Sequence, residues 1–143
     1  MQLHTLISLG LATAVCGVAV RFGDHSARRI GAAFFANWVG SLLVYRINDY
    51  HTDLEMLAID LATLIFFVWV SMRWRRIWTL VASAFMAIIV ASHVATMIDL
   101  RVMINTFNLG MAIWSYGILL CIAFGTWAGW RESRRLESRA GSS

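Results

Sequence analysis

Apolar stretches long enough to cross a bilayer fill most of this chain, and the polar gaps between them alternate in charge. Arginines gather around residues 21–29, at 73–76 and after Trp130, whereas the other gaps contain Asp49, Asp53 and Glu55, then Asp99 and Arg101. Of the 143 residues, 59% are hydrophobic and 14% are charged, against roughly 25% charged in soluble domains. The pattern predicts an all-α integral membrane protein, because a soluble fold of this size cannot bury so much apolar surface.

We expect five transmembrane helices in one compact bundle, because a hydrocarbon core of about 30 Å takes about 20 helical residues. The predicted spans are residues 3–20, 30–45, 54–72, 77–98 and 102–130, followed by a charged cytoplasmic tail at 131–143 that can continue the last helix. We expect the first span to be retained rather than cleaved as a signal peptide, because no Lys or Arg precedes it. Proline is absent, which favours continuous helices over the broken helices of many transporter sites.

The arginines predict the orientation, because cytoplasmic loops carry an excess of Lys and Arg. Ten of the twelve arginines lie in the first gap, the third gap or the tail. With the N-terminus outside and the C-terminus in the cytoplasm, every Arg-rich gap lies in the cytoplasm and every other gap lies outside. The net charge of +4 therefore indicates membrane topology rather than nucleic-acid binding, and the expected compartment is a bacterial inner membrane.

Small residues recur at four-residue spacing on two of the predicted spans. They are Gly117, Cys121, Gly125 and Gly129 on the last span, and Ala32, Ala36 and Gly40 on the second. Such spacing lets membrane helices approach closely. The two stripes therefore pack helices inside the bundle or dock another subunit, and the sequence leaves both interpretations open. Cys16 and Cys121 show no ligand spacing and are expected to be small packing residues.

Polar side chains at membrane depth indicate where chemistry should be sought. Asp60 lies about 9 Å inside the third span and His93 about 8 Å inside the fourth, both measured from the outer end. The tight turn at 73–76 makes these two helices neighbours, so hydrogen bonding between the two side chains is feasible. Asn105 and Asn108 share one helical face with Ser115 and enter from the same side. We expect Asp60, His93, Asn105 and Asn108 to form a polar cluster in the outer half, with Ser92 nearby.

Three interpretations of this cluster remain open. It is a structural hydrogen-bonded cluster, a proton or ion relay, or a site where His93 ligates haem, a chlorophyll-type pigment or a metal. The metal interpretation includes a peripheral zinc site with His4 or His51. Only His93 is deep in a span, which disfavours haem ligated by two histidines. No catalytic residue is predicted, because the chain has no nucleophile motif, HExxH or phosphate-binding glycine loop, and this favours a non-enzymatic role.

Several short motifs in the second half of the chain resemble a known group of proteins. They are Arg75-Arg76-Ile77-Trp78, continuing through His93 to Asp99, then Trp114-Ser115-Tyr116 and Gly125-Thr126-Trp127. Together they resemble a group of small, uncharacterised polytopic inner-membrane proteins of alphaproteobacteria. The resemblance implies the same compartment and assigns no catalytic residue.

These observations favour an accessory or assembly subunit of a larger membrane complex. Minimal loops, stripes of small residues and the absence of a soluble domain support this interpretation. Its partners would be the lipid bilayer and another membrane subunit or a second copy of the chain. The alternatives are a small proton- or ion-linked transporter or channel using Asp60 and His93, and a haem or pigment carrier with a single histidine ligand. No cofactor is predicted from the sequence.

Overall fold

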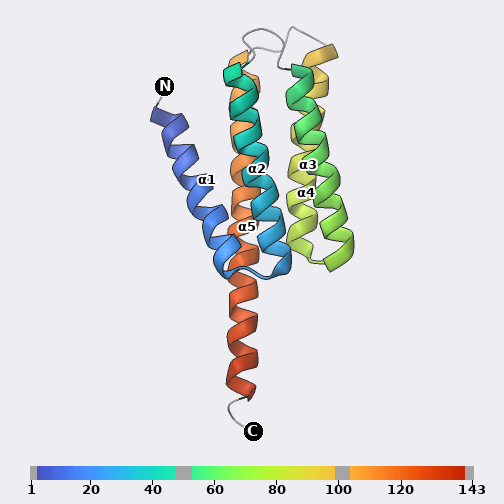
Figure 1. Ribbon diagram of the computed structural model, residues 1–143. Coiled ribbons are helices and arrows are strands. Elements are labelled where there is room, and N and C mark those ends of the chain that lie inside the picture. Colours follow the sequence, from blue (N-terminus) through green and yellow to red (C-terminus); the bar gives the residue numbers. More distant parts are fainter. Residues whose placement is uncertain (1–2, 48–52, 99–103, 141–143) are drawn as a thin grey trace.

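The computed structural model is an all-helical bundle, in which residues 3–47, 53–98 and 104–140 are described (Figure 1). Side chains are described for residues 7–44, 54–98 and 110–139. The helices are α1 (Leu3–Phe22), α2 (His25–Ile47), α3 (Asp53–Trp74), α4 (Ile77–Ile98) and α5 (Ile104–Ala140). The expected helical bundle is therefore confirmed, with a helix at each of the predicted spans.

Two helices extend well beyond their predicted spans: α2 at its start, and α5 at its end, where the tail was expected to be able to continue the helix. α2 begins at His25 rather than residue 30, because the Asp24 carboxylate caps it: Oδ1 accepts a hydrogen bond from the Ala27 backbone N–H at 2.8 Å. Arg28 and Arg29 consequently lie inside the helix. α5 continues beyond residue 130 to Ala140, so the described part of the charged tail extends the helix for its full length of 37 residues.

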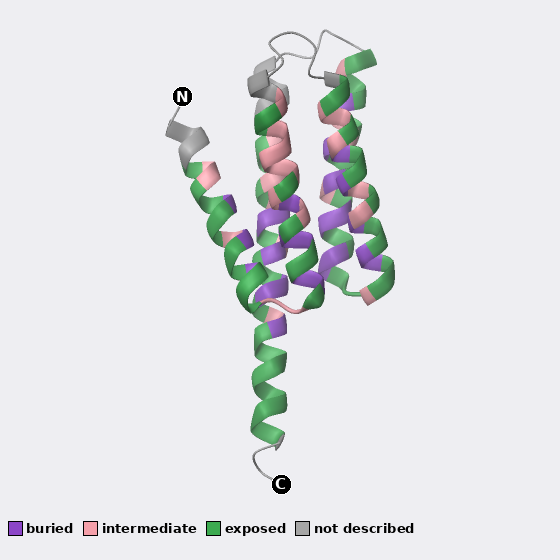
Figure 2. Cartoon of the chain, in the orientation of Figure 1, coloured by how far each residue is buried: buried purple, intermediate pink, exposed green. Residues whose placement is uncertain are grey.

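The helices pack in chain order into a closed ring. α1 contacts α2, α2 contacts α3, α3 contacts α4, α4 contacts α5, and α5 returns to α1, with a further contact between α2 and α5. The largest fully buried side chains include Phe67, Met86, Ile118 and Ile122, from α3, α4 and α5. Buried residues are most frequent in the half of the bundle from which α5 protrudes (Figure 2).

Within the described residues, three helices are long and apolar enough to cross a membrane. These segments are Leu54–Trp74, Ile77–Ile98 and Gly110–Arg139. Ile7–Phe22 of α1 is apolar but shorter within the described residues. Large apolar side chains such as Ile65, Leu80 and Leu120 are exposed on the outer faces. That exposure suits a hydrocarbon solvent, where apolar surface need not be buried.

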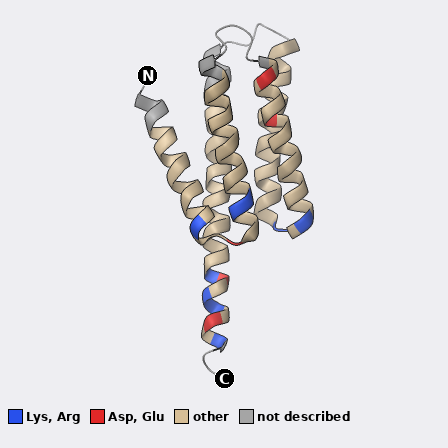
Figure 3. Ribbon diagram, in the orientation of Figure 1, with Lys and Arg blue, Asp and Glu red and all other residues tan. Residues whose placement is uncertain are grey.

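Arginines gather at one end of the bundle (Figure 3). We call it the Arg-rich end; it contains the α1–α2 turn, the α3–α4 turn and the start of the protruding part of α5, with Arg21, Arg28, Arg29, Arg73, Arg75, Arg76 and Arg131. Arg76 donates to Glu132 Oε2 from both Nη1 and Nη2, each at 3.1 Å, and its Nη2 lies 3.9 Å from Asp24 Oδ2. These contacts connect both turns to α5.

Candidate polar site between α2, α3 and α4

A buried pair of ionisable side chains bridges α3 and α4. Asp60 Oδ2 lies 3.0 Å from His93 Nε2. Asp60 is 5% exposed and His93 is 7% exposed. The antiparallel hairpin of α3 and α4 brings the two residues to the same level, as the tight turn between the helices predicts. The structure therefore brings together the two deepest ionisable residues that the sequence singles out.

α2 completes the hydrogen bonding of the pair. Asn37 donates from Nδ2 to Asp60 Oδ1 at 3.0 Å, so both carboxylate oxygens of Asp60 have a partner. Thr63 Oγ1 donates to Asn37 Oδ1 at 3.1 Å and lies 2.9 Å from the Ile59 carbonyl, sharing its proton between the two acceptors. Among the described residues, no buried side-chain nitrogen or oxygen atom lacks a hydrogen-bond partner. We call Asn37, Asp60, Thr63 and His93 the polar site.

A cavity of about 250 Å³ adjoins the polar site. Its polar lining comes from Asn37, Asp60 and His93 together with Ser41 and Ser115. A second cavity of about 130 Å³ lies between α1, α2 and α5, and the two share the lining residues Phe34, Trp38, Met111 and Ser115. The two cavities therefore lie on either side of these shared residues, and Ser8 of α1 and Tyr116 of α5 line the second one.

For the other residues of the predicted cluster, the structure supports the expected position of some and not of others. Ser115 of α5 lines both cavities, as its inward-facing stripe predicts. Asn105 and Asn108 belong to the first turns of α5, but their side chains lie outside the described residues, as do His4 and His51. Ser92 is not among the residues that line the cavity, and its hydroxyl donates to the Ile88 carbonyl at 2.8 Å.

Sequence reasoning did not assign Asn37 and Thr63 to the site. Both left a signal in the sequence. Asn37 is an amide in the middle of a predicted span, where a polar group needs a partner from another helix. Thr63 follows Asp60 by three residues, a spacing that places both on one helical face. The rotational phase of α2, which hydropathy does not give, was the missing information.

The stripe of small residues on α5 packs inside the chain. A Cβ atom added at Gly117 would lie 3.0 Å from the Phe85 ring, and one added at Gly125 would lie 2.6 Å from Cζ2 of Trp78. Gly129 faces the α1–α2 turn, where Asp24 Cβ would lie 3.2 Å from the added atom. Cys121 is half-buried and Cys16 is buried, and both are free thiols. Interior packing therefore accounts for the α5 stripe.

The stripe on α2 behaves differently. Ala32 and Ala36 are exposed, so interior packing does not account for them and docking of another subunit stays open, whereas Gly40 is half-buried beside Ile59. Gly31, one residue away, makes the contact with α1: a Cβ atom there would lie 3.1 Å from Ala19 Cβ. The face that packs on α1 is thus offset by one residue from the stripe, which is about 100° around the helix.

Aromatic residues at the Arg-rich end have two different environments. Trp127 and Trp130 are exposed, and the guanidinium carbons of Arg131 and Arg134 lie 5.3 Å and 4.4 Å from their respective ring centroids. These rings suit a position at the membrane–water interface. Trp78 is instead buried in the core against Gly125.

The surroundings of His93 can be compared with what a metal ion or a pigment would need. Within the described part of the chain, no group of three or more His, Cys, Asp or Glu side chains is arranged to hold a metal ion. His93 Nε2 is paired with Asp60, so an axial ligand role for that atom requires the pair to separate. The adjoining cavity of about 250 Å³ is below the roughly 300–1,000 Å³ of typical small-molecule pockets.

Comparison with known proteins leaves the chemistry of the site as the guide to function. No protein family, no curated protein and no solved structure matches this chain.

Proposed function

We propose that this chain is a multi-pass protein of a bacterial inner membrane, with five spans, the N-terminus outside and the Arg-rich end in the cytoplasm. The positive-inside rule supports this orientation, because the arginines of three separate segments gather at one end of the bundle. The apolar outer surfaces of α3, α4 and α5 support the membrane location. The interfacial tryptophans at the Arg-rich end agree with both.

Cysteine labelling tests the orientation. Cys16 and Cys121 are first replaced by serine, and single cysteines are then introduced as Glu55→Cys and Ser138→Cys, which lie at opposite ends of the molecule. A membrane-impermeant maleimide should label Glu55→Cys in intact spheroplasts and Ser138→Cys only after lysis. The reverse result would contradict the proposed orientation, and equal labelling of both in intact cells would contradict five spans.

We further propose that the polar site exchanges a proton in ion-linked transport. The observation that supports this function is a buried Asp60–His93 pair beside a polar cavity. Asp and His inside membrane spans are the usual groups of proton relays. Two titratable groups 3.0 Å apart can share or transfer a proton directly. The cavity volume of about 250 Å³ far exceeds the ~10–15 Å³ that one water needs, and its serines and amide offer hydrogen-bond partners.

Proteoliposomes test this function. The full chain is reconstituted with a pH-sensitive dye inside, and proton flux is recorded under imposed pH and electrical gradients. The parent should show a flux that Asp60→Asn abolishes, because the amide cannot exchange a proton in the same way. Glu55→Gln, which removes an exposed carboxylate from the same helix, is the matched control and should retain the flux. Absence of flux in the parent at every imposed gradient would exclude the function.

A second candidate is an accessory or assembly subunit of a membrane complex. The exposed small residues Gly17, Ala32 and Ala36 on α1 and α2 favour it, because small residues permit close approach of another membrane helix. Gentle purification in a mild detergent, followed by identification of co-purifying membrane proteins, tests this candidate. Ala36→Leu should release a partner that docks on this face, whereas Ala87→Leu, at an exposed position of α4, should not. An isolated monomer with no co-purifying partner would contradict it.

A further inference from the structure

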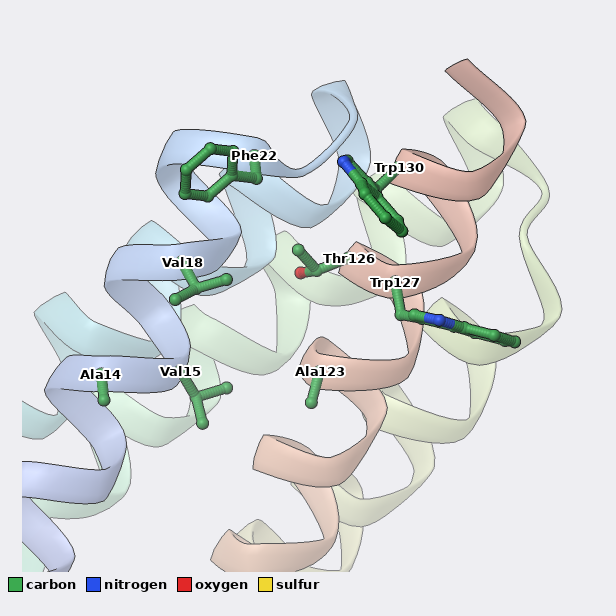
Figure 4. A pocket seen from close by; sticks show the side chains of 8 residues that line it. All are labelled: Ala14, Val15, Val18, Phe22, Ala123, Thr126, Trp127 and Trp130. Carbon is green, nitrogen blue, oxygen red and sulfur yellow. The ribbon is translucent and has the colours of Figure 1, made fainter. Parts of the chain in front are cut away.

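A second feature, separate from the polar site, is a groove between α1 and α5 at the Arg-rich end. It encloses about 440 Å³ and is lined by Ala14, Val15, Val18 and Phe22 of α1 and by Ala123, Thr126, Trp127 and Trp130 of α5 (Figure 4). Phe22 and Trp130 lie at one end of it and Ala14 and Ala123 toward the other (Figure 4). We call these eight residues the α1–α5 groove.

The lining of the groove selects a hydrocarbon ligand. Seven of its eight lining residues are apolar or aromatic. Thr126 is the exception, and its hydroxyl already donates to the Ile122 carbonyl at 2.8 Å. Apart from the indole N–H groups of Trp127 and Trp130, the lining therefore offers mainly apolar contact area. Its volume of about 440 Å³ lies within the roughly 300–1,000 Å³ of small-ligand sites.

The length of the groove corresponds to one leaflet of a bilayer. From Ala14 to Phe22 a helix rises about 12 Å, at about 1.5 Å per residue. Half of a hydrocarbon core is about 15 Å. A groove that starts at the Arg-rich end and follows α1 over this distance matches the depth occupied by one acyl chain of a lipid in that leaflet.

Positive charge lies next to the end of the groove formed by Phe22 and Trp130. Arg131 stacks over Trp127 and Arg134 over Trp130, so two lining residues hold guanidinium groups beside them. The neighbouring Glu132 carboxylate already accepts hydrogen bonds from Arg76. Arg131 and Arg134 are both exposed and therefore accessible to a phosphate, which guanidinium groups bind well.

We propose that the α1–α5 groove binds an anionic phospholipid of the leaflet at the Arg-rich end. One acyl chain fills the groove, and Arg131 and Arg134 contact the phosphate. Apolar lining, one-leaflet length and charge complementarity each favour this occupant. The proposal does not depend on proton exchange at the polar site.

Native mass spectrometry of the full chain tests the proposal, with phosphatidylglycerol and phosphatidylcholine offered in equal amounts. Arg131→Gln/Arg134→Gln should weaken phosphatidylglycerol binding by about 25-fold, about fivefold for each arginine, which corresponds to roughly 1 kcal/mol per residue near an anionic headgroup. Arg135→Gln/Arg139→Gln removes the same charge farther along α5 and should change binding less than twofold. Ala123→Phe should displace the acyl chain, whereas Ala84→Phe, at an exposed position of α4, should leave binding intact.

Three results would overturn the proposal. The first is equal weakening by the two double-arginine variants, which would indicate diffuse attraction rather than a site. The second is unchanged phosphatidylglycerol binding in Ala123→Phe with a native far-ultraviolet circular dichroism spectrum. The third is a dimer that Ala123→Phe dissociates, which would assign the groove to a second copy of the chain.

Discussion

Truncation of the buried pair between α3 and α4 measures how strongly the two helices are coupled through it. In Asp60→Ala, the Asn37 amide and the His93 ring both lose their acceptor, the former at 3.0 Å from Oδ1 and the latter at 3.0 Å from Oδ2. In His93→Ala, Asp60 loses one partner and retains Asn37. The first variant should therefore be the less stable of the two.

The structure sets the expected magnitudes. Each buried polar group left without a partner costs roughly 1–3 kcal/mol, although interhelical hydrogen bonds in membranes average only about 0.6 kcal/mol. We expect Asp60→Ala to lower the free energy of unfolding by about 2–4 kcal/mol and His93→Ala by about 1–3 kcal/mol. The double variant should cost less than the sum, with a coupling energy of about 1–2 kcal/mol, within the usual range for residues in contact.

Unfolding of the purified protein by sodium dodecyl sulfate in mixed micelles, followed by far-ultraviolet circular dichroism, provides the measurement. The four proteins of the cycle are the parent, the two single variants and the double variant. Glu55→Ala combined with His93→Ala serves as the additive control, because Glu55 is exposed on α3. A coupling energy below about 0.5 kcal/mol, the ordinary error of additivity, would refute the energetic importance of the contact.

Three further predictions use the same unfolding assay. Asn37→Leu should cost about 1–2 kcal/mol, because Asp60 Oδ1 loses its donor in a buried site; no loss of stability would contradict the role given to α2. Gly125→Ala should destabilise the protein by about 1–3 kcal/mol, because the new Cβ atom clashes with the Trp78 ring. Gly17→Ala should stabilise it by about 0.5–1 kcal/mol, because no atom lies within 4 Å of the new Cβ. Equal effects of the two variants would show that the contact of Gly125 with Trp78 is not tight. Arg75→Gly should stabilise by up to about 1 kcal/mol, because Arg75 has a φ of 48° in the region that glycine adopts without a steric cost; a destabilised variant would contradict this.

Hydropathy and charge predicted the helices well because both signals are local. The predicted span 77–98 coincides with α4, and the other four differ mainly where capping or a charged continuation extends a helix. Asp24 is an example: as a cap residue it shifts the start of α2 into the arginine cluster. The length of an apolar stretch does not reveal such a capping hydrogen bond, so it does not predict where the helix begins.

Rotational phase was harder to predict, because the outside of a membrane helix is as apolar as its inside. A soluble helix displays its buried face by its hydrophobic period, but that contrast disappears in lipid. Polar residues give the phase only where they occur. The expected contact of Asp60 with His93 rests on their similar depth and on the tight turn between the two helices. Ala32 and Ala36 gave no such information, and they proved to be exposed whereas Gly31 packs on α1.

Packing is uneven along the bundle, and α1 borders several of its cavities. The half near the Arg-rich end is densely buried (Figure 2), and the contacts of Trp78 with Gly125 and of Arg76 with Glu132 close it. α1 has a groove on each flank, one shared with α2 and one with α5. The cavity next to the polar site shares Phe34, Trp38, Met111 and Ser115 with a second cavity that Ser8 and Ala12 of α1 help to line. Asp60 and His93 therefore border a cavity that α2, α3, α4 and α5 line, next to a second cavity to which α1 contributes Ser8 and Ala12.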